Sequence, residues 1–370
     1  MKRKISLFSG IYAPETGGPA KFAQTFSEFA TRQDQCIEVF AYSRLPIFAK
    51  LNSCAEIFLL SNENSILKRF LQMTWCILKS AKSNNSILVN GSFWEVAIAR
   101  HLMNFKYVAK VPGDIVWERA RNLGKTTKNI DNFQNEPLGL SYKILRYFFA
   151  FSLRKAEWVI VPSEHLGELC KSWGVQKSRI VLINNSVFLP TKPDFSSEEK
   201  KFDFVTVCRL VPWKGVDEII INVSELGVKL LVIGDGPERD SLQKLSDSLN
   251  ANVTFVGEIP PEDVPQYLKD CSTFVLNSNF EATSYALIEA QANGLLTIAN
   301  ESTGSEQVIT HNLTGLLCGV KSGINLNQAM RIGLYKDENS KEMRVAARLS
   351  VERSFNLEIN YRKIMDLCIK

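Results

Sequence analysis

Short apolar runs rich in β-branched residues alternate along the whole chain with longer amphipathic stretches. Each run leads into a turn and then into a segment whose apolar positions recur at helical spacing. This alternation predicts an α/β protein built from doubly wound parallel sheets covered by helices. The runs predicted as strands are KISLFSG, IEVFAY, SILVNG and WVIVPS in the first half, and FDFVTVCRL, KLLVIGDG, NVTFVG, TFVLNS and LLTIAN in the second half.

The two sets of predicted strands indicate two domains. A chain of 370 residues is too long for one ordinary hydrophobic core. Residues 189–200 combine prolines, serines and clustered charge, which is typical of a linker. We therefore expect domains over 1–188 and 201–352. The last twenty residues carry apolar positions at helical spacing and predict one terminal helix, with 353–370 as a separate segment.

Composition narrows the class of protein. A hydrophobic fraction of 45% and a charged fraction of 22% exclude disordered and fibrous proteins. The net charge of +5 is compatible with anionic ligands, with anionic membrane surfaces or with ordinary solubility, and is too weak to indicate nucleic acid. The eight cysteines form no C-x-x-C pair and predict free, reduced, buried thiols. Without a signal peptide or a membrane-length apolar run, we expect a cytoplasmic protein whose membrane contact is at most peripheral.

Two predicted helices in the first half are both apolar and basic. Residues 65–82 read SILKRFLQMTWCILKSAK, and residues 141–158 read SYKILRYFFAFSLRKAEW. Each fits a helix that lies on an anionic membrane, and each also fits a helix that packs on the sheet while its lysines reach into water. The second helix leads directly into a predicted buried strand, which favours packing. For the first helix both interpretations stay open.

Ligands of open parallel sheets bind beyond the carboxyl ends of the strands. Gly17 and Gly18 follow the first strand and precede a helix, where they either admit a phosphate close to the backbone or form a plain turn. In the second half, Arg209 and Lys214 follow the strand FDFVTV. Because arginine grips two oxygens and lysine supplies a compact charge, this pair indicates a diphosphate site.

Two glutamates flank the start of another predicted helix. Residues 278–284 are expected to form a loop after the strand TFVL, and a helix is expected from Tyr285 toward Asn293. Glu281 then lies in the loop and Glu289 in the second turn, with free helix amides between them. Eight residues of helix span roughly 12 Å. A nucleoside diphosphate sugar, with hydroxyls at both ends and negative charge in the middle, fits this spacing.

Motifs for other chemistry are missing from the sequence. There is no D-x-D, no G-x-G-x-x-G after the first strand, no P-loop and no nucleophile elbow, and the three histidines form no metal pattern. We therefore expect no metal and no other cofactor, with the two cations neutralising the diphosphate.

An ordered set of motifs across nearly the whole chain resembles one known family, the retaining GT-B-fold glycosyltransferases of family four, also called glycosyl transferases group 1. E-x7-E alone is unspecific, but the ordered set is strong. Its members are GGPA at 17–20, VPSE at 161–164, NNSV at 184–187, CRLVPWKG at 208–215, VIGDGPE at 232–238, VTFVGEIP at 253–260, the pair Glu281 and Glu289, and TGLL at 314–317.

The resemblance implies two Rossmann-like domains that face each other across a cleft, with helix 353–370 crossing back to the N-terminal domain. It also implies that the second domain binds the nucleoside diphosphate sugar. By position, Glu289 binds the ribose, Glu281 the donor sugar, and Arg209 with Lys214 the diphosphate. Backbone amides of Ser284, Tyr285 and Ala286 join them, the loop of Gly257, Glu258 and Ile259 lines the base, and Gly17 with Gly18 approach the phosphates and the acceptor.

The chain departs from the family at one strand end. Many relatives carry a His-Asp pair where this chain has KVPGDIVWE, so Asp114 matches the acid while Gly113 replaces the histidine. Asp114 is either a contact near the reacting centre or a helix cap. The interval EATSYALIE also lacks the usual Gly-Phe after the first glutamate, so the donor sugar cannot be carried over.

The activity implied by the resemblance is transfer of a sugar, with retention, to a hydroxyl of a glycan or lipid-linked acceptor in cell-surface polysaccharide assembly. No side chain is a convincing covalent nucleophile, so we expect attack on the same face that the diphosphate leaves. Two alternatives stay open, namely a catalytically silent subunit of the same fold that binds a partner or membrane, and a sugar-nucleotide epimerase.

Overall fold

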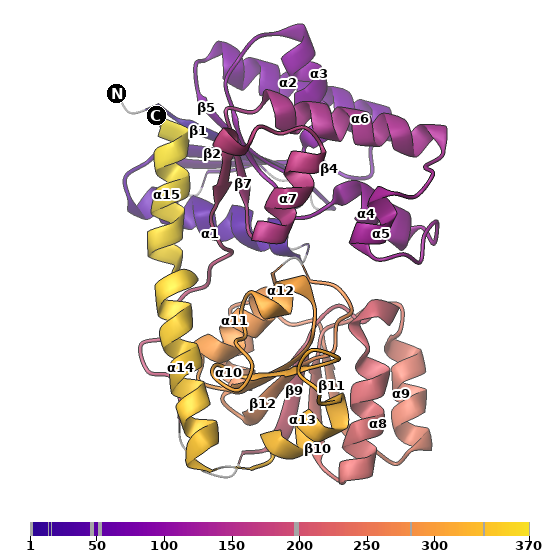
Figure 1. The fold of residues 1–370 in the computed structure, drawn as a ribbon. Helices are drawn as coiled ribbons and strands as arrows, with labels where there is room; N and C mark the ends of the chain where they lie inside the picture. The colour runs from indigo at the N-terminus through magenta and orange to yellow at the C-terminus, as the bar shows by residue number, and fades with distance from the viewer. Residues whose placement is uncertain are drawn as a thin grey trace. The chain divides into compact units, whose positions relative to one another are not determined.

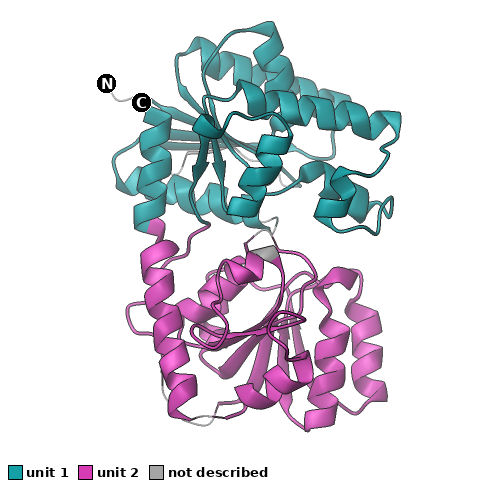
Figure 2. Cartoon of the chain, in the orientation of Figure 1, with its two compact units in different colours: residues 1–184, 358–370 teal, residues 185–357 magenta. Residues whose placement is uncertain are grey.

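The computed structural model describes residues 3–13, 15, 17–44, 48–50, 54–195, 200–281, 283–335 and 337–369, and at 48–50 and 303 the backbone alone. The chain forms two compact units, shown in Figure 2. Unit 1 contains residues 1–184 and 358–370, and unit 2 contains residues 185–357. The predicted boundary at 188 therefore falls four residues after the division between the units.

Over its described residues, unit 1 contains an eight-stranded sheet in the order β3-β4-β2-β1-β5-β6-β7-β8. All neighbours pair in parallel except β3 and β4, which pair antiparallel at one edge. The elements are β1 (Ile5–Ser9), α1 (Gly18–Arg32), β2 (Ile37–Ser43), β3 (Phe48–Lys50), β4 (Ala55–Ser61), α2 (Ile66–Lys82), β5 (Ser86–Asn90), α3 (Phe93–Leu102), β6 (Val108–Lys110), α4 (Ile115–Asn122), α5 (Ile130–Gln134), α6 (Leu140–Lys155), β7 (Trp158–Val161), α7 (Glu164–Ser172), the short helix η1 (Lys177–Arg179), β8 (Ile180–Leu182) and α15 (Leu357–Ile369).

Helices cover both faces of the unit 1 sheet. Helices α2, α3 and α6 pack together on one face, and α1 lies on the other (Figure 1). Helix α15 packs on α1 through Tyr361, whose ring makes edge contacts with Phe22, Phe26 and Phe29. The Tyr361 hydroxyl lies 2.6 Å from the Thr25 hydroxyl, which satisfies its polar atom inside this aromatic cluster.

Unit 2 contains a six-stranded parallel sheet over its described residues, in the order β11-β10-β9-β12-β13-β14. One hydrophobic cluster joins the sheet to α10, α11 and α14, and a second joins it to α8, α9 and α13. The elements are β9 (Phe202–Val207), the short helix η2 (Pro212–Lys214), α8 (Val216–Leu226), β10 (Lys229–Ile233), α9 (Arg239–Ser248), β11 (Asn252–Gly257), α10 (Val264–Leu268), β12 (Cys271–Leu276), α11 (Tyr285–Ala292), β13 (Leu296–Asn300), α12 (Thr303–Glu306), β14 (Leu316–Cys318), α13 (Leu326–Gly333) and α14 (Glu338–Ser354).

The predicted fold class, two helix-covered parallel sheets of the doubly wound kind, is confirmed, and each run predicted as a strand contains one. Strands β3, β4, β6, β8 and β14 were not among the predicted runs. Strands β3, β6, β8 and β14 have three residues each, which is too short for a periodic signal.

The prediction of one terminal helix over the last twenty residues is wrong. Helix α14 ends at Ser354 and α15 begins at Leu357. Between them the chain pairs with a strand-like segment, because Val187 donates its backbone N–H to the carbonyl of Phe355 at 3.1 Å and bridges Asn356. The N–H of Phe355 still closes the last turn of α14 on the carbonyl of Val351 at 2.9 Å, and the bridge at Asn356 interrupts the helical path after it. Residues 358–370 belong to unit 1.

The segment predicted as a linker packs on unit 2 along its described part, 189–195. Arg348 on α14 donates to the carbonyl of Pro190 at 2.9 Å, and Arg344 donates to the carbonyl of Phe195. The N–H of Asp194 donates to the carbonyl of Asn293 at 3.2 Å. Proline, serine and charge therefore mark a segment without regular structure here, but its path is held by α14. Residues 196–199 of the predicted linker lie outside the described residues.

Candidate functional site

The strand order of unit 2 changes direction between β9 and β12. From β9 the chain adds β10 and β11 on one side, and from β12 it adds β13 and β14 on the other. At such a switch point the loops leave the strand ends in opposite directions and open a crevice for ligands. The loop after β9 carries Arg209 and Lys214, and the loop after β12 carries Glu281. Three predicted site residues therefore lie at the switch point.

Lys214 and Glu281 form an ion pair, although 67 positions of sequence separate them. Their side chains are 17% and 12% exposed, so the pair is largely shielded from water. Burial lowers the pKa of the Lys214 ammonium, but the Glu281 carboxylate opposes this and leaves that pKa above its usual value. Lys214 is therefore fully charged at neutral pH, and the carboxylate of Glu281 is held beside it.

Hydrogen bonds between the segments that follow β9 and β12 bring this pair together. Asn277 donates from Nδ2 to the carbonyl of Gly215 at 3.1 Å and to Glu218 at 2.7 Å, and the N–H of Asn279 donates to the carbonyl of Trp213 at 2.9 Å. Gly215 has a φ of 58°, and a Cβ there would lie 2.7 Å from the carbonyl oxygen of Asn277. Glycine is therefore required for this close approach.

The backbone of Glu281 packs against the start of α12. A Cβ built on Gly304 would lie 2.3 Å from the carbonyl oxygen of Glu281 and 2.7 Å from its Cβ. Next to it, the Thr283 hydroxyl donates to the side-chain oxygen of Gln307 at 2.9 Å, and Asn185 donates to the carbonyl of Thr283 at 3.3 Å. These contacts hold the loop from both sides.

Helix α11 begins where the sequence predicted. Ser284 caps it, because its Oγ accepts from the N–H of Leu287 at 3.3 Å, and the hydroxyl of Tyr285 donates to Asn185 at 3.2 Å. Tyr285 and Ala286 form the first turn, so the helix N-terminus points its amides and positive dipole end out of α11 beside the Glu281 loop. Glu289 is partly exposed in the second turn.

Arg209 differs from Lys214 in having its charge uncompensated. Its side chain is exposed and makes no hydrogen bond or ion pair within the described chain.

Gly257 ends β11, two strands from β9, and its carbonyl accepts from the N–H of Gly234 at 2.8 Å. After it, Glu258 is exposed and Ile259 packs against the core. This loop is therefore at the same end of the sheet as the cations, and a base contact stays a prediction.

Gly17 and Gly18 lie in unit 1 at the start of α1. Gly17 is the N-cap, with a φ of 140° and no side chain to cap the helix, and Gly18 is the first helical residue. The strand order of unit 1 changes direction between β1 and β5, and the glycines follow β1. Their contact with donor phosphates or acceptor stays a prediction.

Asp114 is buried and fully engaged as the N-cap of α4. Its carboxylate accepts from the N–H groups of Val116 and Trp117 at 3.0 and 3.1 Å, from Gln134 at 3.0 Å and from Arg146 at 2.7 Å. This geometry supports the capping alternative. A role of Asp114 at the reacting centre stays a prediction.

Glu118 fills the space that the missing side chain of residue 113 leaves. A Cβ built on Gly113 would lie 2.4 Å from Oε1 of Glu118. Burial, with a smaller contribution from the Asp114 carboxylate, raises the pKa of Glu118 to about 7. Sequence reasoning gave Glu118 no role, because a glutamate in the first turn of a helix is ordinary surface chemistry.

Asn185, Asn277 and Gly304 also received no role from the sequence. Asn277 directly follows the buried strand β12, and this position at a strand end could have indicated from the sequence that Asn277 belongs to the site. Asn185 lies in the quoted motif NNSV, and nothing local indicates that it reaches residues 283 and 285. Gly304 is required by packing against Glu281, which sequence alone does not show.

Within the described residues, no group of three His, Cys, Asp or Glu side chains is placed to hold a metal ion. No helix of the described chain is long and apolar enough to cross a membrane.

Comparison with solved structures identifies the fold as GT-B. The Anabaena protein HepE, solved in complex with UDP and glucose, superposes with a TM-score of 0.75 over 99% of this chain and 99% of its own, at 17% identity. Sucrose-phosphate synthase from Thermosynechococcus elongatus superposes with a TM-score of 0.78 over 99% of this chain and 98% of its own, at 18% identity. These likenesses concern the fold.

Sequence comparison matches part of the chain to a known family. Residues 190–350 match the family described as glycosyl transferases group 1. One curated relative, the GDP-mannose-dependent alpha-(1-6)-phosphatidylinositol monomannoside mannosyltransferase of Mycobacterium tuberculosis, is 27% identical over 176 residues, which are 44% of this chain and 46% of that protein. The chain thus spans about half the length of this relative. Over residues 190–350 the chain therefore matches glycosyl transferases group 1, the family that the sequence motifs resemble.

Proposed function

We propose that this protein transfers a sugar from a nucleoside diphosphate sugar to a hydroxyl of a glycan or lipid-linked acceptor, in the assembly of a cell-surface polysaccharide. The observation that carries the proposal is the arrangement at the switch point of unit 2. Arg209 presents an uncompensated charge there, the Lys214–Glu281 pair lies beside it, and α11 carries Glu289. Cations and a helix N-terminus suit a diphosphate, and flanking carboxylates suit hydroxyls.

Each residue then has one task. Arg209, Lys214 and the first amides of α11 bind the diphosphate and stabilise the negative charge that develops as it leaves. Glu281 accepts hydrogen bonds from donor-sugar hydroxyls, and Glu289 accepts them from the ribose. Because Lys214 is paired with Glu281, binding of the diphosphate and orientation of the sugar are coupled through one contact.

The proposed transfer retains the configuration at the anomeric carbon. The acceptor hydroxyl attacks from the face that the diphosphate leaves, and a diphosphate oxygen accepts its proton. Catalysis comes from placing the two substrates together and from neutralising the leaving group, which needs no covalent intermediate. Metal independence is part of the proposal, because Arg209 and Lys214 take the place of a divalent ion.

A lipid-linked acceptor is supported by the surface of α2 in unit 1. Ile66, Leu67 and Trp75 on this helix are 74%, 68% and 61% exposed, and Lys68, Lys79 and Lys82 are exposed with them. Helix α2 carries no acidic residue. Exposed apolar side chains among lysines suit the interface of an anionic membrane, so we propose peripheral attachment through α2.

The test of the function starts with nucleoside diphosphate sugars that differ in base and sugar, screened by thermal shift and then incubated with candidate acceptors. Transfer of the sugar with retained configuration, unaffected by EDTA, is the expected result. Complete loss of turnover in EDTA, restored by Mg²⁺ or Mn²⁺, contradicts metal independence. Formation of an epimer without acceptor identifies an epimerase, and absence of nucleotide binding identifies a silent subunit.

A further inference from the structure

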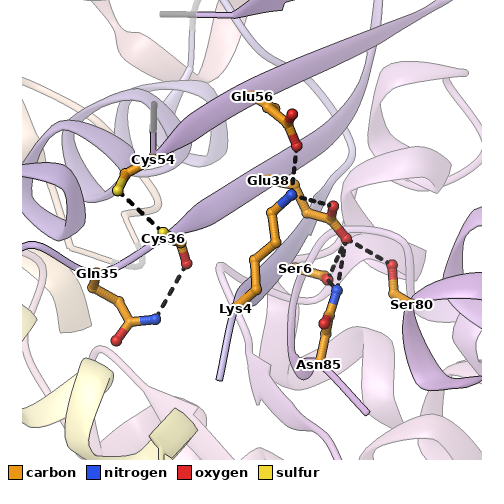
Figure 3. A network of polar contacts seen from close by, with 9 residues as sticks. All are labelled: Lys4, Ser6, Gln35, Cys36, Glu38, Cys54, Glu56, Ser80 and Asn85. Carbon is orange, nitrogen blue, oxygen red and sulfur yellow. Dashed lines mark hydrogen bonds and ion pairs between the residues drawn. The ribbon is translucent and has the colours of Figure 1, made fainter. Parts of the chain in front are cut away.

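Two cysteine side chains meet at the amino ends of neighbouring strands in unit 1 (Figure 3). Cys36 precedes β2 and Cys54 precedes β4, and the parallel register pairs Ile37 with Ala55. The Cys36 thiol donates a hydrogen bond to the sulfur of Cys54 at 3.1 Å. Neither cysteine is in a disulfide and both are partly exposed, whereas five of the remaining six are buried. This pair therefore combines contact between two thiols with access from solvent.

The surroundings hold the two thiols in place. Lys4 forms ion pairs with Glu38, at 3.1 Å, and with Glu56 (Figure 3). Glu38 also accepts from the hydroxyls of Ser6 and Ser80 and from Asn85, at 2.6, 3.0 and 3.1 Å. This network joins β1, β2 and β4 at the same end of the sheet as the thiols.

We propose that Cys36 and Cys54 form a dithiol site that small-molecule disulfides, of which oxidised glutathione is one, oxidise to an intramolecular disulfide. The Cys54 thiolate, with Cys36 as its hydrogen-bond donor, attacks one sulfur of the reagent and releases the first reagent thiolate. The deprotonated sulfur of Cys36 then attacks the sulfur of Cys54 and releases the second. Two protein thiols lose two electrons and two protons, and one reagent disulfide becomes two thiols.

The geometry suits this step. Sulfur atoms in a disulfide are about 2.05 Å apart, so the two atoms need to approach by about 1 Å. The hydrogen bond to Cys54 and burial raise the pKa of the Cys36 thiol, while the Lys4 ammonium opposes the rise. Because the thiolate is the reacting form, oxidation becomes faster as the pH rises above neutrality.

The bond closes a covalent ring that contains β2 and residues 44–54. Arg44 in this ring donates its backbone N–H to Glu15 at 2.6 Å, in the loop between β1 and α1. Cross-linking reduces the freedom of the unfolded chain and leaves the folded register unchanged. Oxidation therefore raises the melting temperature of the protein, and this effect does not depend on the proposed transferase activity.

The experiment treats the purified full-length protein with oxidised glutathione at pH 8 and maps its peptides by mass spectrometry without reduction. We expect loss of two hydrogens from the intact mass, a peptide pair linked through Cys36 and Cys54, and a higher melting temperature that dithiothreitol reverses. Exclusive glutathione adducts on separate cysteines, disulfide-linked dimers, or no reaction would each overturn the proposal.

Matched variants check the pairing. Cys36→Ser and Cys54→Ser should each retain one glutathione adduct and form no intramolecular bond. Cys208→Ser, which changes another partly exposed cysteine, should still form the Cys36–Cys54 bond. A trivalent arsenical, which binds two neighbouring thiols, should bind the wild type and Cys208→Ser. It should not bind Cys36→Ser or Cys54→Ser. If a variant fails to fold, the linked peptide in the wild type still decides the matter.

Discussion

The ammonium of Lys214 binds the carboxylate of Glu281, and the two residues come from loops that leave neighbouring strands of unit 2 in opposite directions. Without ligand, each charge satisfies the other. A diphosphate that approaches Lys214 therefore either displaces Glu281 from the ammonium or binds the ammonium together with it. The same ion pair with Lys214 orients the carboxylate of Glu281. This coupling gives different expectations for the two glutamates and for the residues that support them.

Gly304 positions Glu281 and should be sensitive to a single methyl group. In Gly304→Ala the new Cβ would meet the carbonyl oxygen of Glu281 at 2.3 Å, so the Glu281 backbone must move. Because a misplacement of about 1 Å can cost about a hundredfold in rate, kcat should fall by one to two orders of magnitude. Nucleoside diphosphate affinity should change much less.

Gly139→Ala is the matched control for this substitution, because a Cβ at residue 139 meets no atom within 4 Å. Its kcat should equal that of the wild type. Steady-state kinetics of both variants make the comparison. Wild-type turnover in Gly304→Ala would show that the position of the Glu281 backbone is unimportant.

Asp114 should act mainly on stability. Asp114→Ala removes an N-cap, which costs about 1 kcal/mol, and leaves Arg146 without its buried partner, which costs about 3 to 5 kcal/mol. Arg146→Met should destabilise the protein through the same ion pair. Denaturant unfolding measures both losses. If Asp114→Asn retains stability and yet loses a hundredfold or more in kcat, Asp114 acts at the reacting centre.

Glu118 should make the stability of unit 1 depend on pH. Burial raises its pKa to about 7 in the folded protein, above the value near 4.5 in the unfolded chain. The folded state therefore binds the extra proton between these values, and this contribution to stability is present below pH 4.5 and lost as the pH rises through 7. The loss is on the order of 3 kcal/mol, since one pKa unit corresponds to about 1.4 kcal/mol.

Glu118→Gln should remove this loss. Its melting temperature should exceed that of the wild type at pH 8 and approach it at pH 5. Glu168→Gln, at an exposed glutamate of α7, should show no such difference between the two pH values. A stability difference between Glu118→Gln and wild type that is the same at both pH values would mean that Glu118 does not carry the proton.

The sequence predicted the sheets, the α11 start and the strand-end residues, because these follow from local periodicity and turn chemistry. It could not predict that Lys214 and Glu281 pair, since the contact depends on which strands are neighbours in the sheet. The roles of Gly304 and Glu118 could not be predicted for the same reason. Gly304 matters because it packs closely against Glu281, and Glu118 because it packs closely against Gly113. The prediction of one continuous terminal helix was wrong because residue 187 pairs with residues 355 and 356. This is a long-range contact, which the spacing of apolar residues along a helix cannot reveal.

Helix α2 should bind anionic membranes through its exposed residues. Leu67→Asp with Leu71→Asp should abolish cosedimentation with anionic liposomes at low salt, and Val320→Asp, on an exposed apolar residue of unit 2, should not. Replacement of Lys68, Lys79 and Lys82 by Glu should weaken binding strongly. Arg69 is unsuited to this test because it donates to the carbonyl of Asn62 and packs over Tyr42. Liposome binding that is the same in all variants would place the contact elsewhere or make it unspecific.

Substitutions of Glu281 and Glu289 should impair the protein in different ways, because the proposed function places the two carboxylates at opposite ends of the donor. Glu289 contacts the ribose alike in the ground and transition states, so Glu289→Ala should weaken nucleoside diphosphate binding by about 1.5 to 3 kcal/mol, or about ten- to a hundredfold. Glu281 orients the sugar as charge develops, so Glu281→Gln should lower kcat strongly. Since it also releases Lys214, its affinity for the nucleoside diphosphate should be unchanged or higher.

Calorimetry with the nucleoside diphosphate, combined with turnover of the same two variants, measures the two roles separately. The predicted result is a loss of affinity in Glu289→Ala alone, together with a loss of kcat in Glu281→Gln at retained affinity. Equal losses of affinity in both variants, or wild-type turnover in Glu281→Gln, would contradict the assignment of the two carboxylates to the two ends of a nucleoside diphosphate sugar.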